Sequence, residues 1–352
     1  MKLLLKLYFV FLLIMLPLIS YPQIGGESTY QFLNLPVSAR AAALGGNVTA
    51  IDDDDLNLIY FNPSLLSEGM NQHLLFDYVS YFSDINYGYA AYASDFLPGV
   101  NFAAGIQFLN YGEFQRADEF GIKSGKFYAA EYALNLMASK KLNKNFRVGV
   151  NIKPIYSSLE KYQSWGLATD IGLLYSDTSR LFSASLVLKN IGMQIVPYHG
   201  NSRERLPFEI QAGAALKLRH APIRIVANVN HLETPDLTYE KPTYPVNDYS
   251  YYQSDDLKET FFEKSYDHFM RHLNIGMEFI PFKNFFVRVG YNYRRRQEMK
   301  IASRVSTVGF SWGFGVKIYK FYLNYGRADY HLAGSTNHFS VRTDLNSFYK
   351  SK

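Results

Sequence analysis

Apolar and polar side chains alternate along most of the chain between residues 72 and 345. In one such segment four apolar residues lie on one face and polar or small residues on the other: Phe146, Val148, Val150 and Ile152 against Arg147, Gly149, Asn151 and Lys153. A period of two is typical of a β-strand with two different surroundings. The segments run to about 9 to 15 residues, the length of strands that cross a membrane at a tilt rather than of strands in a soluble sandwich.

The pattern predicts roughly fourteen strands, an even number as expected for a closed single-chain barrel. The predicted strands are 72–82, 84–96, 101–111, 127–140, 146–158, 162–175, 181–191, 208–219, 222–232, 272–281, 284–294, 305–317, 320–329 and 338–345. Mid-strand charges accompany them at Arg147, Lys153, Glu209, Glu278 and Arg288. These charges predict a polar, water-filled lumen.

The connectors between predicted strands sort into two kinds. Those after even-numbered strands are tight, as at 141–145 and 282–283, and those after odd-numbered strands are mostly longer, as at 112–126, 192–207 and 233–271. Membrane barrels have tight turns at the periplasmic rim and long loops at the outer rim, with both termini periplasmic. A soluble sandwich gives no reason for this sorting. We therefore predict an all-β fold, a transmembrane antiparallel barrel.

The first 71 residues do not alternate. Residues 1–22 combine a short basic start with an apolar run, which predicts a secretory signal peptide rather than a membrane anchor helix. Residues 23–71 are rich in Ala and Gly and carry an acidic run, and we predict that they fold into the lumen as a plug. A tail outside the barrel is the alternative. The barrel is then expected to occupy residues 72–352.

Composition narrows the chemistry. The chain contains no cysteine, which excludes disulfides and thiolate sites. Its 29 Tyr and 27 Phe suit membrane interfaces. The net charge of +5 is scattered, so nucleic acid is not an expected partner.

The sequence contains partial matches to catalytic and metal-binding motifs, but each match is incomplete. Ser158 and Lys161 match Ser-x-x-Lys but lack the partner motifs of penicillin-binding enzymes. The run from Asp52 to Asp55 lacks the Gly and Glu of a calcium loop, and predicts a solvated turn or a cluster of ion pairs between plug and wall. We place His268 and His272 in a loop with no third ligand. No catalytic residue, cofactor or metal is expected.

Two features are candidate contact sites. Arg294, Arg295 and Arg296 are predicted at the outer end of a strand, where arginine could bind lipopolysaccharide phosphates. A rim charge cluster is the simpler interpretation. The long loop 233–271 carries Tyr244, Tyr249, Tyr251 and Tyr252, which we predict to bind a partner protein unless the loop is a lid over the lumen.

Several motifs resemble those of a known family. The segment from Ser28 to Asn47 reads STYQFLNLPVSARAAALGGN, and NPSLL follows from Asn62 to Leu66. Further matches are YFSDINYG at 81–88, FLNYG at 108–112, YSSLE at 156–160 and LPFEI at 206–210. Together they resemble the PorQ family of outer-membrane proteins in the type IX secretion system. The resemblance covers most of the chain after the signal and is weakest at 233–271.

The resemblance implies a barrel similar to the FadL class, with about fourteen strands and a plug. It also implies an attachment complex in which the barrel anchors a PorZ-like surface protein, together with a PorU-like sortase and a PorV-like barrel. The expected function is therefore a non-enzymatic docking platform. The alternative is a FadL-like transporter of a hydrophobic small molecule, and a cargo shuttle is not separable from docking by sequence.

Overall fold

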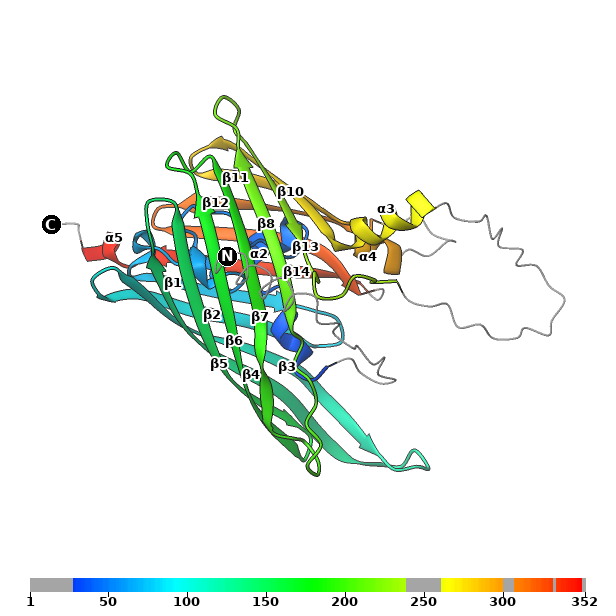
Figure 1. The fold of residues 1–352 in the computed structure, drawn as a ribbon. Coiled ribbons are helices and arrows are strands. Elements are labelled where there is room, and N and C mark those ends of the chain that lie inside the picture. Colours follow the sequence, from blue (N-terminus) through cyan, green and yellow to red (C-terminus); the bar gives the residue numbers. More distant parts are fainter. Residues whose placement is uncertain (1–27, 239–260, 300–306, 332–333, 350–352) are drawn as a thin grey trace, which may run out of the picture.

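The computed structural model describes residues 28–238, 261–299, 307–331 and 334–349. Fourteen antiparallel strands close into one barrel, each strand pairing with its sequence neighbours and β1 pairing with β14 (Figure 1). The predicted fold class is confirmed. None of the helices in the described residues is long and apolar enough to cross a membrane.

The wall consists of β1 (His73–Ser80), β2 (Asn86–Leu97), β3 (Val100–Ala117), β4 (Lys123–Lys141), β5 (Phe146–Leu159), β6 (Tyr162–Ser176), β7 (Phe182–Val196), β8 (Glu209–Lys217), β9 (Ile223–Val229), β10 (Leu273–Phe282), β11 (Phe285–Asn292), β12 (Phe310–Ile318), β13 (Phe321–His331) and β14 (Gly334–Asp344). The helices attached to the wall are α3 (Phe261–His272), α4 (Tyr293–Met299) and α5 (Asn346–Tyr349).

Each predicted strand is present, but some bounds differ. β3 and β4 extend well past their predicted ends, so the predicted loop 112–126 shrinks to a short connector and their hairpin projects beyond the barrel (Figure 1). The predicted strand at 305–317 begins only at Phe310. The predicted loop 233–271 contains most of α3.

The two rims differ as the connectors predict. One rim, here the short-turn rim, holds the tight turns, the start of β1, the end of β14 and α5. The opposite rim, the long-loop rim, holds α3, α4 and the longer connectors (Figure 1). The connectors β1–β2 and β5–β6 at the long-loop rim are nevertheless short.

The wall is apolar outside and polar inside. In β10, Ile275, Met277 and Phe279 are each about two-fifths exposed, while Asn274 and Glu278 point inward and are buried. The same alternation runs along the other strands, as a lipid-facing outer surface requires.

The prediction of a water-filled lumen is wrong in one respect. The inward charges do face the lumen, but Lys153, Glu209, Glu278 and Arg288 are at most 3% exposed and Arg147 is 9% exposed. Water is displaced because residues 28–72 fill the lumen as a plug.

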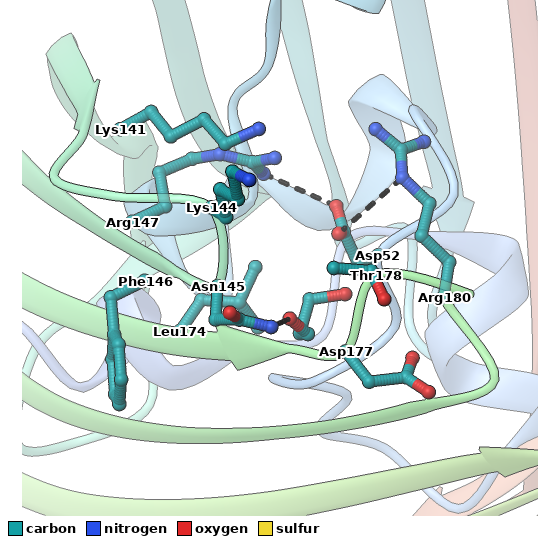
Figure 2. Close-up of a pocket in the computed structure, with 11 residues that line it drawn as sticks. Asp52, Lys141, Lys144, Asn145, Phe146, Arg147, Leu174, Asp177, Thr178 and Arg180 are labelled. Atoms are coloured by element: carbon teal, nitrogen blue, oxygen red, sulfur yellow. Dashed lines mark hydrogen bonds and ion pairs between the residues drawn. The ribbon is translucent and has the colours of Figure 1, made fainter.

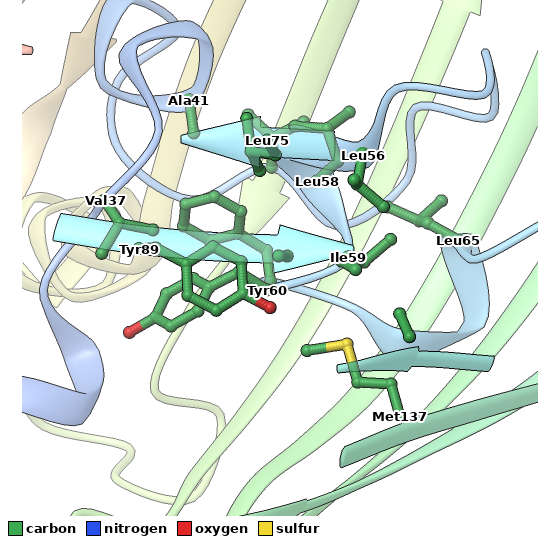
Figure 3. Packing of buried hydrophobic residues seen from close by; sticks show 14 of the residues in the cluster. Val37, Ala41, Leu56, Leu58, Ile59, Tyr60, Leu65, Leu75, Tyr89 and Met137 are labelled. Carbon is green, nitrogen blue, oxygen red and sulfur yellow. The ribbon is translucent and has the colours of Figure 1, made fainter. Parts of the chain in front are cut away.

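The plug contains η1 (Gln31–Asn34), α2 (Ala39–Ala43), η2 (Leu56–Leu58), η3 (Pro63–Leu65) and η4 (Glu68–Met70). Local capping starts three of these turns: the Ser38 hydroxyl accepts from Ala41 N, the Asp55 carboxylate accepts from Asn57 N, and the Asn62 carboxamide accepts from Ser64 N ahead of Pro63. The plug's apolar side chains form the main hydrophobic core, with Leu58, Ile59 and Tyr60 packed against wall residues Leu75, Tyr89 and Met137 (Figure 3).

Small residues on both sides let the plug touch the wall backbone. α2 and the next residues lie on four wall glycines, Gly276, Gly290, Gly313 and Gly326. A Cβ on Gly290 would lie 2.3 Å from Gly45 N, and one on Gly326 would lie 2.3 Å from Ala39 O. The small-residue stretch of the sequence is therefore a close backbone contact between plug and barrel.

Candidate functional site

The lumen contains one dominant charged cluster, centred on Glu278. This carboxylate is fully buried and lies 2.8 Å from Arg40 of the plug, 2.6 Å from Arg224 of β9 and 2.7 Å from Arg288 of β11. Arg224, Glu278 and Arg288 are directly opposite one another on three adjacent strands. The wall therefore presents a preformed row of charges to which one plug arginine binds.

The plug's acidic run completes the cluster. Arg40 also lies 2.7 Å from both Asp53 and Asp55, and Asp53 lies 2.7 Å from Arg224. Burial alone would raise the pKa of Asp53, but Arg40 and Arg224 lower it below its usual range. The acidic run is thus a set of ion pairs between plug and wall, as one of the two sequence interpretations predicts.

The short-turn mouth is also lined with ion pairs. A cavity of about 220 Å³ lies there between the plug, the ends of β4, β5 and β6, and the turn that leads to β7 (Figure 2). Asp52 is 3.2 Å from Arg147 and 3.8 Å from Arg180, and Arg180 is 2.7 Å from Asp54. Lys141 and Lys144 complete the basic side of this mouth.

The middle of the lumen is polar and packed rather than open. Lys153 of β5 lies 2.6 Å from Asp170 of β6 and donates to Asn190 of β7. Lys189 lies 5.4 Å from the centre of the Tyr60 ring, within cation–π range. Such contacts within the wall and between wall and plug fill the middle of the lumen with packed polar side chains.

The long-loop mouth contains a second cavity, of about 250 Å³. Its floor is the plug at Asn34, Leu35, Pro36, Gly46 and Asn47, and the ends of β9, β10, β11 and β13 with α3 and α4 form its sides. We call it the outer pocket.

An apolar cavity of about 320 Å³ lies elsewhere, on the outside of the wall. Its lining includes the outward side chains of Tyr92, Phe96, Ala104 and Leu136 on β2, β3 and β4. This external groove faces the lipid side and is separated from the lumen by the wall.

The structure places Arg294, Arg295 and Arg296 in a different element from the predicted one. Residues 294–296 belong to helix α4, not to a strand. Arg294 and Arg295 line the outer pocket; Arg294 pairs with Glu298 at 2.5 Å, and Arg295 is 9% exposed. Arg296 donates to Val308 O. The Asn292 side chain accepts from Arg295 N at the start of α4, and the Arg295 guanidinium reaches the plug, where it donates to Gly45 O.

The remaining candidate residues have different outcomes. Tyr244, Tyr249, Tyr251 and Tyr252 lie outside the described residues, as does the predicted signal peptide. The prediction of a loop around His268 and His272 is wrong, since both lie on α3, where His272 hydrogen-bonds to Asn230 O at 2.7 Å. The described residues contain no cluster of three or more His, Asp or Glu that could hold a metal. Ser158 lies in strand β5, away from any helix start.

Sequence reasoning missed the most important contacts. The sequence marks Arg40 only as part of a motif, and its partner Glu278 lies 238 positions away. The one usable signal is parity, since Arg224, Glu278 and Arg288 all fall on inward positions of neighbouring strands. Five asparagines of the outer pocket give no signal at all.

Comparisons with known proteins agree with this architecture. No family model matches the chain, and no curated protein matches it. The toluene transporter TbuX of Ralstonia pickettii is similar at a TM-score of 0.55 and 12% identity, covering 89% of this chain and 99% of that one. The P. putida toluene transporter TodX is similar at 0.53 and 11% identity, covering 89% and 99%. At this identity the likeness shows a shared fold.

Proposed function

We propose that the chain is a plugged outer-membrane barrel that acts as a docking platform in the type IX secretion system. It would hold a PorZ-like surface protein beside a PorU-like sortase and a PorV-like barrel. The apolar outer wall supports the membrane location. The motifs from Ser28 to Asn47 and from Asn62 to Leu66 support the assignment to this system.

One observation carries the choice of docking: the plug is fastened to the wall at charged and backbone contacts, and polar side chains pack the middle of the lumen. Arg40 joins Glu278, Asp53 and Asp55, and α2 lies directly on wall glycines. A barrel whose interior is fixed and polar is suited to binding partner proteins at its surface.

The long-loop rim offers such a surface. The β3–β4 hairpin projects beyond the rim, and near its tip Phe120 is 81% and Ile122 is 65% exposed (Figure 1). Exposed aromatic and aliphatic side chains on a projecting hairpin are typical of protein contacts. We therefore place partner contacts on this hairpin as well as on the predicted loop 233–271.

Passage of a small hydrophobic molecule is the second candidate, and the comparisons support it more directly than they support secretion. TbuX and TodX, which share the fold, are both described as toluene transporters. The external groove on β2–β4 could receive such a molecule from the lipid side. Transport would require the plug to move or rearrange.

A disulfide lock separates the two candidates. Thr49 of the plug and Ser185 of β7 have hydroxyl oxygens 2.9 Å apart, and the chain has no cysteine of its own. In the double variant Thr49→Cys with Ser185→Cys, oxidation would fix the plug. Docking predicts that pull-down from solubilised membranes recovers the partners equally well before and after oxidation. Loss of hydrophobic solute uptake on oxidation, restored by a reductant, would instead establish transport; Thr49→Cys alone is the control.

A surface variant tests docking from the other side. Replacing Phe120 and Ile122 by Ser should reduce recovery of the large partner in the pull-down by tenfold or more, on the order of the effect of hot-spot residues. The control is Tyr319→Ser, which removes a similarly exposed aromatic (76%) from the short-turn rim. Equal recovery from both variants would move the contact to another part of the rim.

A further inference from the structure

We propose that the outer pocket binds a small hydroxylated oxyanion, of the size of one sugar carrying a phosphate or a carboxylate. This inference does not depend on docking or on transport, since the same side chains line the pocket in either case. It rests on the charge, the buried arginine, the carboxamides and the size of the cavity.

The lining is cationic. Arg271, Arg294 and Arg295 line the pocket with His231, and none of the described lining residues is Asp or Glu. Arg271 and Arg294 have carboxylate partners outside the lining, Asp267 at 2.6 Å and Glu298 at 2.5 Å. His231 is likewise paired with Glu233 at 3.1 Å, so Arg295 is the cation of the lining to which the ion pairs of the described residues give no carboxylate.

Arg295 is the exceptional member. Its Nη2 donates to Gly45 O at 3.2 Å, and its guanidinium lies 4.0 Å from the centre of the Tyr330 ring. Its Nη1 atom is buried and has no hydrogen-bond partner among the described residues. In the ion pairs that these residues form, the neighbouring Arg294 has a carboxylate partner but Arg295 has none. Burying a cation without a partner anion costs free energy. A bound oxyanion toward which the guanidinium rotates would supply that partner and offset the cost.

The rest of the lining suits hydroxyl groups. Five asparagines surround the arginine: Asn34, Asn47, Asn230, Asn274 and Asn292. Each carboxamide both donates and accepts, which matches the dual role of a sugar hydroxyl. Hydrogen bonds hold these amides in place, from Asn292 Nδ2 to Asn274 Oδ1 at 2.7 Å and from Asn47 Nδ2 to Asn230 Oδ1 at 3.3 Å.

The size and floor of the pocket limit the occupant. A volume of about 250 Å³ holds one sugar-sized group and excludes a folded segment. The floor is plug backbone, where a Cβ on Gly46 would lie 3.3 Å from Arg295 Nη2. An occupant would therefore be retained at the mouth.

Calorimetry on the full-length barrel in detergent tests the site, with glucose 6-phosphate and galacturonate as probes and glucose as the uncharged control. We expect both anions to bind and glucose not to bind. Arg295→Gln should weaken anion binding at least tenfold, whereas Arg116→Gln should leave binding unchanged, because Arg116 is an exposed arginine of β3 paired with Glu160 and does not line the pocket. Asn47→Ala serves as a second variant that keeps the buried arginine in place, and it should weaken binding severalfold.

The possible outcomes are distinct. No binding of either anion, or equal binding by wild type and Arg295→Gln, would overturn the proposal, as would inorganic phosphate binding as tightly as glucose 6-phosphate. Where the anions bind, competition identifies the source. Displacement by solubilised lipopolysaccharide supports a surface glycolipid as occupant, and its failure to compete supports a free sugar anion.

Discussion

Two buried arginines at opposite ends of the plug have different surroundings. Toward the short-turn rim, Arg40 reaches the wall and is matched by three carboxylates, those of Glu278, Asp53 and Asp55. At the long-loop mouth, Arg295 reaches from the wall to the plug and, among the described residues, meets a carbonyl and an aromatic ring but no carboxylate. Both side chains are buried, at 4% and 9% exposure.

This difference distinguishes an arginine that holds the plug against the wall from an arginine that is proposed to bind a ligand. A buried charge with matched partners is expensive to disturb and serves to hold two parts of a protein in one arrangement. A buried charge without a partner is a local deficit that a ligand can fill. The same residue type therefore has a structural role at one end of the plug and a proposed recognition role at the other.

The largest expected effect is at the matched end. Glu278→Ala would leave Arg40, Arg224 and Arg288 without their shared carboxylate, and should cost about 3–5 kcal/mol of unfolding free energy. Urea unfolding, followed by the change in gel mobility of the folded barrel, measures it. Glu160→Ala removes an exposed pair with Arg116 and should cost less than about 1 kcal/mol. Similar losses in the two variants would contradict a special role for the cluster.

The next effect concerns the backbone seat of the plug. Gly290→Ala would place a methyl group 2.3 Å from Gly45 N and Leu44 C, so either plug or strand must shift. Overpacking of this kind costs about 1–3 kcal/mol. Limited trypsin digestion should then cut at Arg40, which is buried in the native barrel. Gly334→Ala, where none of the described residues comes within 4 Å of the new Cβ, is the matched control and should leave the plug protected.

A smaller effect is expected at the unmatched end. Arg295→Met removes a buried cation that has no carboxylate partner in the described part of the chain, while keeping an apolar contact with the Tyr330 ring. The unfolding free energy should change by less than about 1 kcal/mol in either direction, because the loss of the hydrogen bond to Gly45 O and of the cation–π contact is offset by the removal of a buried charge without a carboxylate partner among the described residues. The same urea experiment measures it. A loss as large as that of Glu278→Ala would show that the two ends do not differ in kind.

The smallest effect is a pH dependence at the long-loop mouth. Burial lowers the pKa of His231, but the hydrogen bond to Glu233 and the charge of Glu209 outweigh it and raise that pKa above its usual range. A raised histidine pKa contributes stability that is complete below the ordinary value of 6.5 and is lost as the pH rises through the folded-state pKa. Between about pH 5.5 and about pH 8.5 the thermal midpoint should fall slightly for wild type relative to His231→Gln. Parallel curves would refute the assignment.

The sequence predicts the wall better than its ends. Each of the fourteen predicted strands is present, although some ends differ, because lipid on one side and polar contacts on the other impose a period of two. The prediction is wrong at the outer end of β11, since residues 293–299 turn into α4. Three consecutive arginines have no amphipathic period, and the helix begins after Asn292, whose side-chain oxygen accepts a hydrogen bond from Arg295 N.

The sequence by itself determined the barrel, its strand count and parity, and which residues face the lumen. Each of these follows from local alternation that a single strand carries on its own. Only the tertiary structure decided what the inward residues meet: that Glu278 joins Arg40, that wall glycines seat α2, and that Arg295 meets no carboxylate among the described residues. Those pairings join residues hundreds of positions apart in the sequence. They form because the barrel closes around the plug, which brings plug residues against the inner face of distant strands.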